Sequence, residues 1–189
     1  KVELTRKLVH IGTGFLTLFF PIMIGNHWLV LVLCSSFSLI LILSLKFNLL
    51  RSINAIERES VGSIAYPVSV YGCYLAYDHF DQHFIYFYLP IIILAICDPI
   101  AALTGKRWPI GKYKVGKENK TMMGSSMFFV SAFAIVMIFL IPGVESGKAV
   151  IIGISIALIA SVSEALSRKG YDNITIPASV LVSLILIEH

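Results

Sequence analysis

The chain has 189 residues, of which 57% are hydrophobic and only 14% are charged, and its mean hydropathy is +0.86. Soluble domains carry about 25% charged residues, so this composition excludes a disordered chain, a coiled coil and a disulfide-rich secreted scaffold. It also argues against a nucleic-acid-binding protein, although the net charge is +4. The composition is that of an integral membrane protein.

Long runs without Asp, Glu, Lys or Arg predict the membrane-spanning helices. A span needs about 17–25 mostly apolar residues, because the bilayer core is about 30 Å thick and a helix rises about 1.5 Å per residue. The first run, residues 8–45, is long enough for two spans, and Pro21, Gly25 and Asn26 supply the break. We therefore expect an all-α polytopic membrane protein, with one transmembrane domain over residues 1–189. About seven helices are expected: 4–24, 27–45, 61–77, 84–104, 123–142, 147–167 and 174–188.

The basic residues predict the orientation in the membrane. With seven spans, all fifteen Lys and Arg residues except Lys148 fall on one side. Basic residues favour the cytoplasmic side, so we expect the N-terminus in the cytoplasm and the C-terminus outside. Residues 46–60 have one apolar and one charged face, which predicts an interfacial segment. No small-residue cleavage site follows the first apolar stretch, so we expect no cleavable signal peptide there.

Ionisable side chains near the apolar runs are the strongest functional candidates, because charge is costly in a bilayer. Asp98 has apolar residues on both sides, and Pro99 predicts a kink or break in the fourth helix. A structural aspartate neutralised by a lysine is the alternative for Asp98. Glu164 stands at the inner end of the sixth helix, shortly before Asp172, and its alternative is a solvated ion pair.

The first helix carries cations and an imidazole near the same boundary. Lys7, His10 and Gly14 follow the spacing of one helix face. The alternative interpretation of Arg6 and Lys7 is that they only anchor the helix end on the cytoplasmic side, as the positive-inside rule predicts. For His10 the alternative is a hydrogen-bonded structural histidine.

The connection at residues 105–123 is rich in glycine and lysine and predicts a cytoplasmic nucleotide-binding loop. Glycines let backbone N–H groups approach an anion, lysines supply countercharge, and the amides that open the fifth helix favour anions. Residues 111–117 nearly match a P-loop, but Glu118 replaces the required Ser or Thr and no strand precedes, so we reject a P-loop. A basic loop that sets topology and contacts anionic lipids is the alternative. The candidate phosphate-binding residues are Gly105, Lys106, Gly111, Lys112, Lys117, Lys120, Thr121, Gly124 and Ser125.

Carboxylates beside such a loop indicate metal-assisted chemistry on a phosphate. Mg²⁺ prefers a few carboxylates together with substrate phosphates and water. Phosphoryl transfer needs positioning and charge neutralisation more than covalent catalysis. The expected partners are a nucleotide from the cytoplasm and a second substrate from the lipid.

Five motifs follow one another along nearly the whole chain: Arg6-Lys7-Leu-Val-His10-Ile-Gly12, Asp98-Pro-Ile-Ala-Ala-Leu-Thr-Gly105 with Gly111-Lys112, Lys120-Thr121-x-x-Gly124-Ser125, Glu164-Ala-Leu, and Asp172-Asn173-Ile-Thr-Ile-Pro177. Together they resemble the polyprenol kinase family, which includes dolichol kinase, phytol and farnesol kinases and the CTP-dependent diacylglycerol kinase. The resemblance implies transfer of the terminal phosphate of a nucleotide, typically CTP, to a lipid alcohol with a divalent metal such as Mg²⁺. Phytol, farnesol, polyprenol and diacylglycerol all stay open as acceptors, and the oligomeric state is not predicted.

The roles that we expect follow from these motifs. Lys106, Lys112, Lys117 and Lys120, with Thr121 and Ser125, hold the triphosphate, and Asn173 joins the nucleotide site. Asp98 binds the metal or accepts the hydroxyl proton, while Glu164 and Asp172 complete the metal site. Arg6 or Lys7 neutralises the transferring phosphoryl group, and His10 is a second candidate base.

Two other functions are the alternatives. A membrane cytidylyltransferase shares the aspartate and the Lys-Thr-x-x-Gly-Ser motif, but residues 167–173 lack its Pro-Gly-His-Gly-Gly run and the carboxylates that follow. A small transporter fits seven spans, but the second, third and fifth helices have no charged residue in their cores. Span count alone does not fix function.

Overall fold

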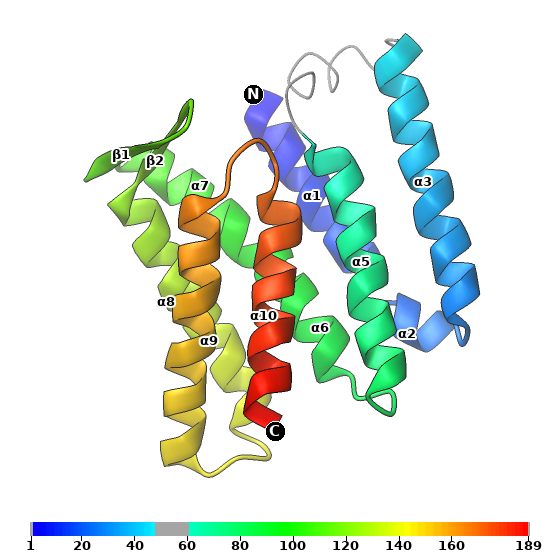
Figure 1. Cartoon of the computed structure of the whole chain (residues 1–189). Coiled ribbons are helices and arrows are strands. Elements are labelled where there is room, and N and C mark those ends of the chain that lie inside the picture. The colour runs from blue at the N-terminus through cyan, green and yellow to red at the C-terminus, as the bar shows by residue number, and fades with distance from the viewer. Residues whose placement is uncertain (1, 48–60, 189) are drawn as a thin grey trace.

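The structure, a computed structural model, describes residues 2–47 and 61–188, and the side chains within these ranges except those of residues 2–8, 45, 63 and 188. The helices form a bundle, and two strands form a hairpin at one of its ends (Figure 1). The elements are α1 (Val2–Thr17), α2 (Phe20–Met23), α3 (His27–Phe47), α5 (Gly62–His79), α6 (Ile85–Ile92), the π-helical turn η1 (Ile93–Cys97), α7 (Asp98–Arg107), β1 (Lys112–Val115), β2 (Glu118–Thr121), α8 (Met122–Leu140), α9 (Ser146–Leu166) and α10 (Asp172–Glu188).

Each of the seven expected helical segments has a helical counterpart, with ends that differ by at most three residues. The first segment is divided into α1 and α2. Pro21 has no amide hydrogen to donate to the Thr17 carbonyl, so the chain turns before the helix resumes. The first two residues of the expected interfacial segment belong to α3. The rest of that segment, residues 48–60, lies outside the described residues.

The fourth expected helix is continuous, so of the kink or break predicted at Asp98 the break is wrong. Asp98 itself has helical angles, with φ −63° and ψ −47°. The helix instead accommodates Pro99 by a π-helical turn over Ile93–Cys97. Proline removes one backbone donor, and the helix continues through a widened turn and does not end there.

The expectation of an all-α fold is wrong over residues 112–121, which form a two-stranded hairpin. Tyr113 pairs with Lys120 in its register. Gly116 opens the two-residue turn with φ +61°, a conformation that favours glycine. The alternation of basic and apolar side chains over 112–115 is the strand signal that the interpretation as a glycine-rich loop missed.

The helix formed by α6, η1 and α7 runs through the middle of the bundle. Phe87, Leu89, Ile93 and Leu94 on it have no exposed surface. α8 packs against α7, α9 packs against α8, and α10 packs against α9 and α5. α3 packs chiefly on α5 and lies at the edge of the bundle, where it exposes many large apolar side chains.

Four helices in the described ranges are long and apolar enough to cross a bilayer: His27–Ser44, Ile85–Arg107, Met122–Leu140 and Ser146–Leu166. Val9–Met23 and Asp172–Ile187 are apolar but shorter. The lengths and apolar composition of the four long helices are those of an integral membrane protein. The number of seven spans stays a prediction.

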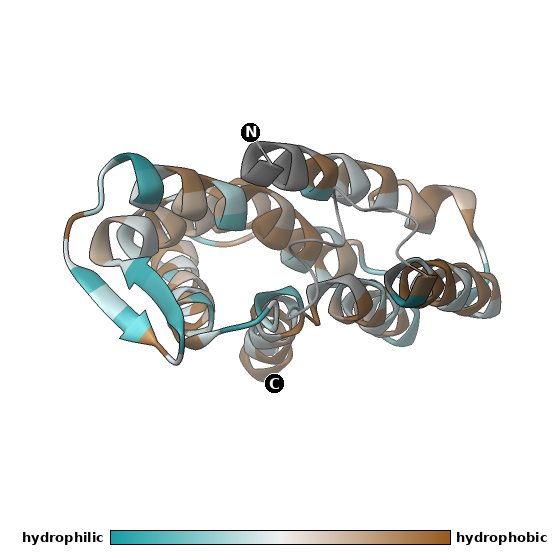
Figure 2. Cartoon of the chain, turned by 90° about the horizontal axis from the view of Figure 1, so that it is seen from above, coloured by the Kyte–Doolittle hydropathy of each residue, from teal (hydrophilic) through white to brown (hydrophobic). Residues whose placement is uncertain are grey.

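The polar segments gather at one end of the bundle. The start of α1, the end of α3, the hairpin and the α9–α10 connection lie there, whereas the end of α10 and the α8–α9 connection lie at the other end (Figure 1). Seen from above, the hairpin is a hydrophilic edge beside largely apolar helices (Figure 2). The basic hairpin and the α9–α10 connection thus share one end, as expected, while the side of the membrane stays a prediction.

Candidate active site

Asp98 is buried at the start of α7, where α1 packs on η1. Its Oδ2 atom lies 4.0 Å from Nε2 of His10, which also lies 3.3 Å from the carbonyl oxygen of Leu94. Gly14 approaches η1 closely, because a Cβ atom at this position would lie 2.5 Å from Cβ of Ala95. The structure therefore brings two predicted catalytic residues, His10 and Asp98, together through the expected face of α1.

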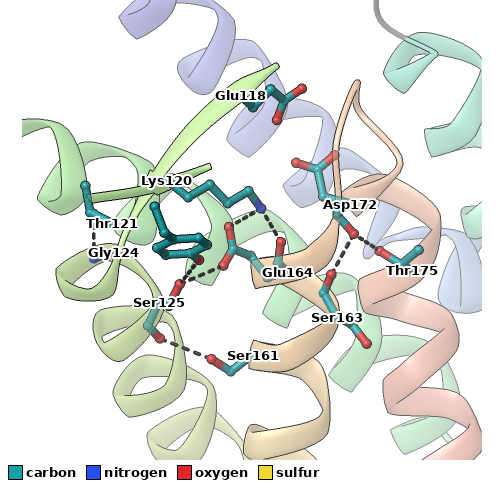
Figure 3. A network of polar contacts seen from close by, with 12 residues as sticks. Glu118, Lys120, Thr121, Gly124, Ser125, Ser161, Ser163, Glu164, Asp172 and Thr175 are labelled. Carbon is teal, nitrogen blue, oxygen red and sulfur yellow. Dashed lines mark hydrogen bonds and ion pairs between the residues drawn. The ribbon is translucent and has the colours of Figure 1, made fainter. Parts of the chain in front are cut away.

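Lys120 of β2 reaches the inner end of α9. Its Nζ atom lies 2.8 Å from Oε1 of Glu164 and also donates to the Glu164 carbonyl oxygen (Figure 3). The other carboxylate oxygen, Oε2, accepts from Oγ of Ser125 at 3.5 Å. A negative charge near a helix C-terminus is disfavoured by the helix dipole, and the ammonium group offsets it. Residues of β2, α8 and α9 thus form one partly buried network.

Two residues that the sequence did not single out complete this network. The hydroxyl group of Tyr113 lies 2.7 Å from Oγ of Ser125. The hydroxyl group of Ser161 donates to the Ser125 carbonyl over 3.1 Å. Tyr113 is paired with Lys120 across the hairpin, and paired residues project from the same face of a sheet. The hairpin therefore presents one phenol and one ammonium group to α8 and α9.

The hairpin is also attached to the connection between α9 and α10. Oε1 of Glu118 accepts the backbone N–H of Lys169 at 2.5 Å. The Lys169 carbonyl in turn accepts the N–H of Val61, just before α5. A Cβ atom on Gly116 would lie 3.2 Å from a guanidinium nitrogen of Arg168. These contacts hold the hairpin against the end of α9 that carries Glu164.

Two of the predicted phosphate-binding glycines pack helices together. A Cβ atom on Gly105 would lie 2.5 Å from Oγ1 of Thr121, and one on Gly124 would lie 2.9 Å from the Ala101 carbonyl oxygen. Side chains at these positions would push α7 and α8 apart. The structure therefore shows a packing role for Gly105 and Gly124, and their contact with a nucleotide stays a prediction.

The first amides of α8 already have partners within the protein. Oγ1 of Thr121 caps the helix by accepting the N–H of Gly124 at 3.0 Å. The N–H groups of Met122 and Met123 donate to carbonyl oxygens in the segment before the hairpin. An anion at this helix terminus would have to displace these bonds, so the expected anion-binding amides are not available in this structure.

The pleat of the hairpin separates the predicted phosphate-binding lysines. Side chains alternate between the two faces of a strand, so Lys112 lies on the face opposite Tyr113 and Lys120. Lys112 and Lys117 are exposed, as is Lys106 in the last turn of α7. The structure thus places one lysine in the partly buried network and three at the surface of the same region.

Asn173 and Asp172 begin α10. Nδ2 of Asn173 donates to the Gly62 carbonyl at 3.3 Å, and the Asn173 carbonyl accepts the hydroxyl group of Ser69 at 2.5 Å. Oδ1 of Asp172 accepts the N–H of Asn173 at the helix N-terminus, where a carboxylate is favourable. Asn173 therefore joins α10 to α5, and its contact with a nucleotide stays a prediction.

Arg6 and Lys7 lie in α1, one turn or less before His10. Their side chains are outside the described part of the structure. The role that we expect of them, neutralising a phosphoryl group, stays a prediction.

The three predicted metal-binding carboxylates do not form a preformed metal cage. Among the described residues, no three His, Cys, Asp or Glu side chains gather closely enough to hold a metal ion. Mg²⁺ in phosphoryl transfer is commonly held by one or two carboxylates plus substrate phosphates and water. The residues present fit an ion of that kind, shared between one carboxylate and a nucleotide, and not an ion held by protein ligands alone.

The bundle and its site define a class: a helical integral membrane protein with a buried carboxylate and a basic hairpin towards one end. No family model matches the sequence, and no solved structure matches the chain. A phytol kinase from Synechocystis sp. is 30% identical over 179 residues, which cover 93% of this chain and 75% of that relative. The chain therefore belongs to the polyprenol and phytol kinase family and is a lipid kinase.

Proposed function

We propose that this kinase transfers the terminal phosphate of a nucleoside triphosphate, with CTP as the first candidate, to the hydroxyl group of a lipid alcohol. The similarity to a phytol kinase over 93% of the chain carries the proposal. The geometry supports it, because the buried carboxylate of Glu164 and the basic hairpin lie together at one end of an apolar bundle. Phytol is the first acceptor to test, followed by farnesol, polyprenol and diacylglycerol.

The chemical step is an in-line displacement at phosphorus. The lipid hydroxyl oxygen forms a bond to the terminal phosphorus, the bond to the bridging oxygen breaks, and the nucleoside diphosphate leaves. The hydroxyl proton passes to a carboxylate, for which Asp98 is our candidate. Asp98 is buried within a helix that is long and apolar enough to span the membrane, and a carboxylate in such a place is a functional candidate.

The positive groups of the hairpin and of α1 serve the nucleotide. Lys120, with Lys106, Lys112 and Lys117 nearby, neutralises the triphosphate, and Arg6 or Lys7 neutralises the transferring phosphoryl group. Lys120 exchanges its contact with Glu164 for a phosphate oxygen when the nucleotide binds. Mg²⁺, when bound, neutralises phosphate charge and orients the transferring group, and Asp98, Glu164 or Asp172 are the carboxylates that would hold it. The basic end faces the cytoplasm, where nucleotides are available.

Product analysis tests this function. The purified chain in nanodiscs is incubated with CTP, ATP, GTP or UTP, each labelled on the terminal phosphate, and with each of the four alcohols. A labelled lipid phosphate together with the nucleoside diphosphate is the expected result. A CDP-lipid with release of pyrophosphate would instead show a cytidylyltransferase, and no transfer to any acceptor would overturn the proposal.

A further inference from the structure

The π-turn creates a demand for a hydrogen-bond donor. In a π-helix the N–H of each residue bonds the carbonyl five positions earlier. The donor that would serve the Leu94 carbonyl in this pattern is residue 99, which is proline and has no N–H. Leu94 has no exposed surface, and a buried carbonyl that lacks a donor is costly.

His10 meets this demand from α1. Its Nε2 atom lies 3.3 Å from the Leu94 carbonyl oxygen. A carbonyl oxygen can only accept, so Nε2 must carry a hydrogen for this bond to form. The same nitrogen is the His10 atom that lies 4.0 Å from Oδ2 of Asp98. A nitrogen that already carries a hydrogen cannot take a proton from a substrate, so His10 cannot act as a base on the side that faces Asp98.

We propose that His10 is a positioning residue: its Nε2–H satisfies the Leu94 carbonyl that Pro99 leaves without a backbone donor, and this bond fixes the π-turn from which Asp98 projects. The inference deepens the proposed function and rests on it for the role of Asp98. Of the two candidate bases that the sequence offers, it assigns proton acceptance to Asp98.

Further contacts of α1 fix the imidazole against η1. The ring of Tyr66 packs edge-on against the His10 ring, with 5.6 Å between the centroids. The Tyr66 hydroxyl group lies 3.0 Å from Oγ1 of Thr17. One turn beyond His10, Gly14 contacts Ala95 so closely that any side chain would force α1 away from η1. α1 is therefore held against η1 and α5 from His10 to Thr17.

The protonated nitrogen can be observed directly. Histidine side chains labelled with ¹⁵N are observed by NMR in the full chain in nanodiscs, and the signal of His10 among the five histidines is the one that His10→Gln removes. A hydrogen on Nε2 is expected. A bare Nε2 would overturn the proposal. This readout does not depend on kinase activity, so it still decides the inference if the proposed function fails.

A pair of substitutions at His10 separates positioning from base catalysis. Glutamine places an amide donor near the position of Nε2 but is no base, whereas leucine offers no donor. We expect His10→Gln to keep kcat within about tenfold of the original enzyme, since one retained hydrogen bond is at stake, and His10→Leu to lose considerably more, with the nucleotide KM unchanged in both. Equal loss of kcat in the two variants would overturn the positioning role.

Two glycines of α1 supply a matched control. An added Cβ at Gly14 would lie 2.5 Å from Cβ of Ala95, whereas one at Gly12 would meet nothing within 4 Å. Both alanine variants raise helix propensity equally. We expect Gly14→Ala to lower kcat without changing the nucleotide KM and Gly12→Ala to leave both unchanged. Equal kcat values for the two variants would contradict the proposal.

Discussion

Nζ of Lys120 lies 2.8 Å from Oε1 of Glu164, although the two residues are 44 positions apart in the sequence. The pair joins the hairpin to the inner end of α9. It also joins the cation that we assign to the triphosphate with a carboxylate that we assign to the metal site. A bound triphosphate would therefore compete with Glu164 for the same ammonium group.

This ion pair predicts a coupled effect on stability. Lys120→Met leaves the Glu164 carboxylate largely buried without its cation, a change that costs about 3–5 kcal/mol at buried pairs. We expect lower thermal stability for Lys120→Met and partial recovery in Lys120→Met/Glu164→Gln, measured by thermal unfolding in detergent. Lys120→Arg, which keeps the charge, is the control. Additive losses in the double variant would contradict a direct pair.

The phenol of Tyr113 predicts a milder effect. Tyr113→Phe removes a single hydrogen bond to Ser125 and leaves the ring in place. One neutral hydrogen bond is worth about 0.5–1.5 kcal/mol, so we expect kcat/KM to fall by about two- to tenfold. Tyr171→Phe is the control, because Tyr171 is exposed on the α9–α10 connection. The phosphotransfer assay measures both, and equal rates for the two variants would rule out a role for the Tyr113 hydroxyl group.

The close approach of α7 to α8 predicts sensitivity to one methyl group. Gly105→Ala would place a Cβ atom 2.5 Å from Oγ1 of Thr121, whereas a Cβ atom at Gly147 would meet nothing within 4 Å. Overpacking of this kind costs about 1–3 kcal/mol. We expect a lower unfolding temperature and weaker nucleotide binding for Gly105→Ala, and neither change for Gly147→Ala. If the two variants unfold at the same temperature, α7 and α8 are not in contact as described.

The orientation predicts which ends a water-soluble reagent reaches. Lys114→Cys on the hairpin and Glu145→Cys before α9 lie beyond the two opposite ends of α8. The native cysteines are buried. We expect a membrane-impermeant maleimide to label Lys114→Cys from the cytoplasmic side and Glu145→Cys from the other side. Labelling of both from one side would show that α8 does not span the bilayer.

The sequence predicts the helical segments well because each apolar run must be long enough for the bilayer. It fails where distant contacts decide the local structure. Pro99 predicts a kink or break when only its neighbours are considered, but the helix continues through a π-turn, where His10 of α1 contacts the Leu94 carbonyl. No local pattern indicates this contact, since the two partners are 84 positions apart.

The candidate site shows the same division. The spacing of α1 predicts that His10 and Gly14 share a face, and both contact η1. The composition of the loop predicts basic residues near Glu164, but the alternation that makes Tyr113 and Lys120 neighbours was obscured by the glycines around it. The sequence predicts phosphate contacts for Gly105 and Gly124, whereas in the packed structure they lie where helices approach closely.

Asp98 is the residue on which the account depends most. The decisive measurement is transfer of labelled terminal phosphate to a lipid alcohol by Asp98→Asn, with Asp81→Asn as the control. Asp81 belongs to the connection between α5 and α6, which lies at the end of the bundle away from the hairpin (Figure 1). Its φ is +48°, a conformation that asparagine tolerates well. We predict that Asp98→Asn binds the nucleotide and forms no lipid phosphate, while Asp81→Asn retains full activity. Full activity in well-folded Asp98→Asn would contradict it.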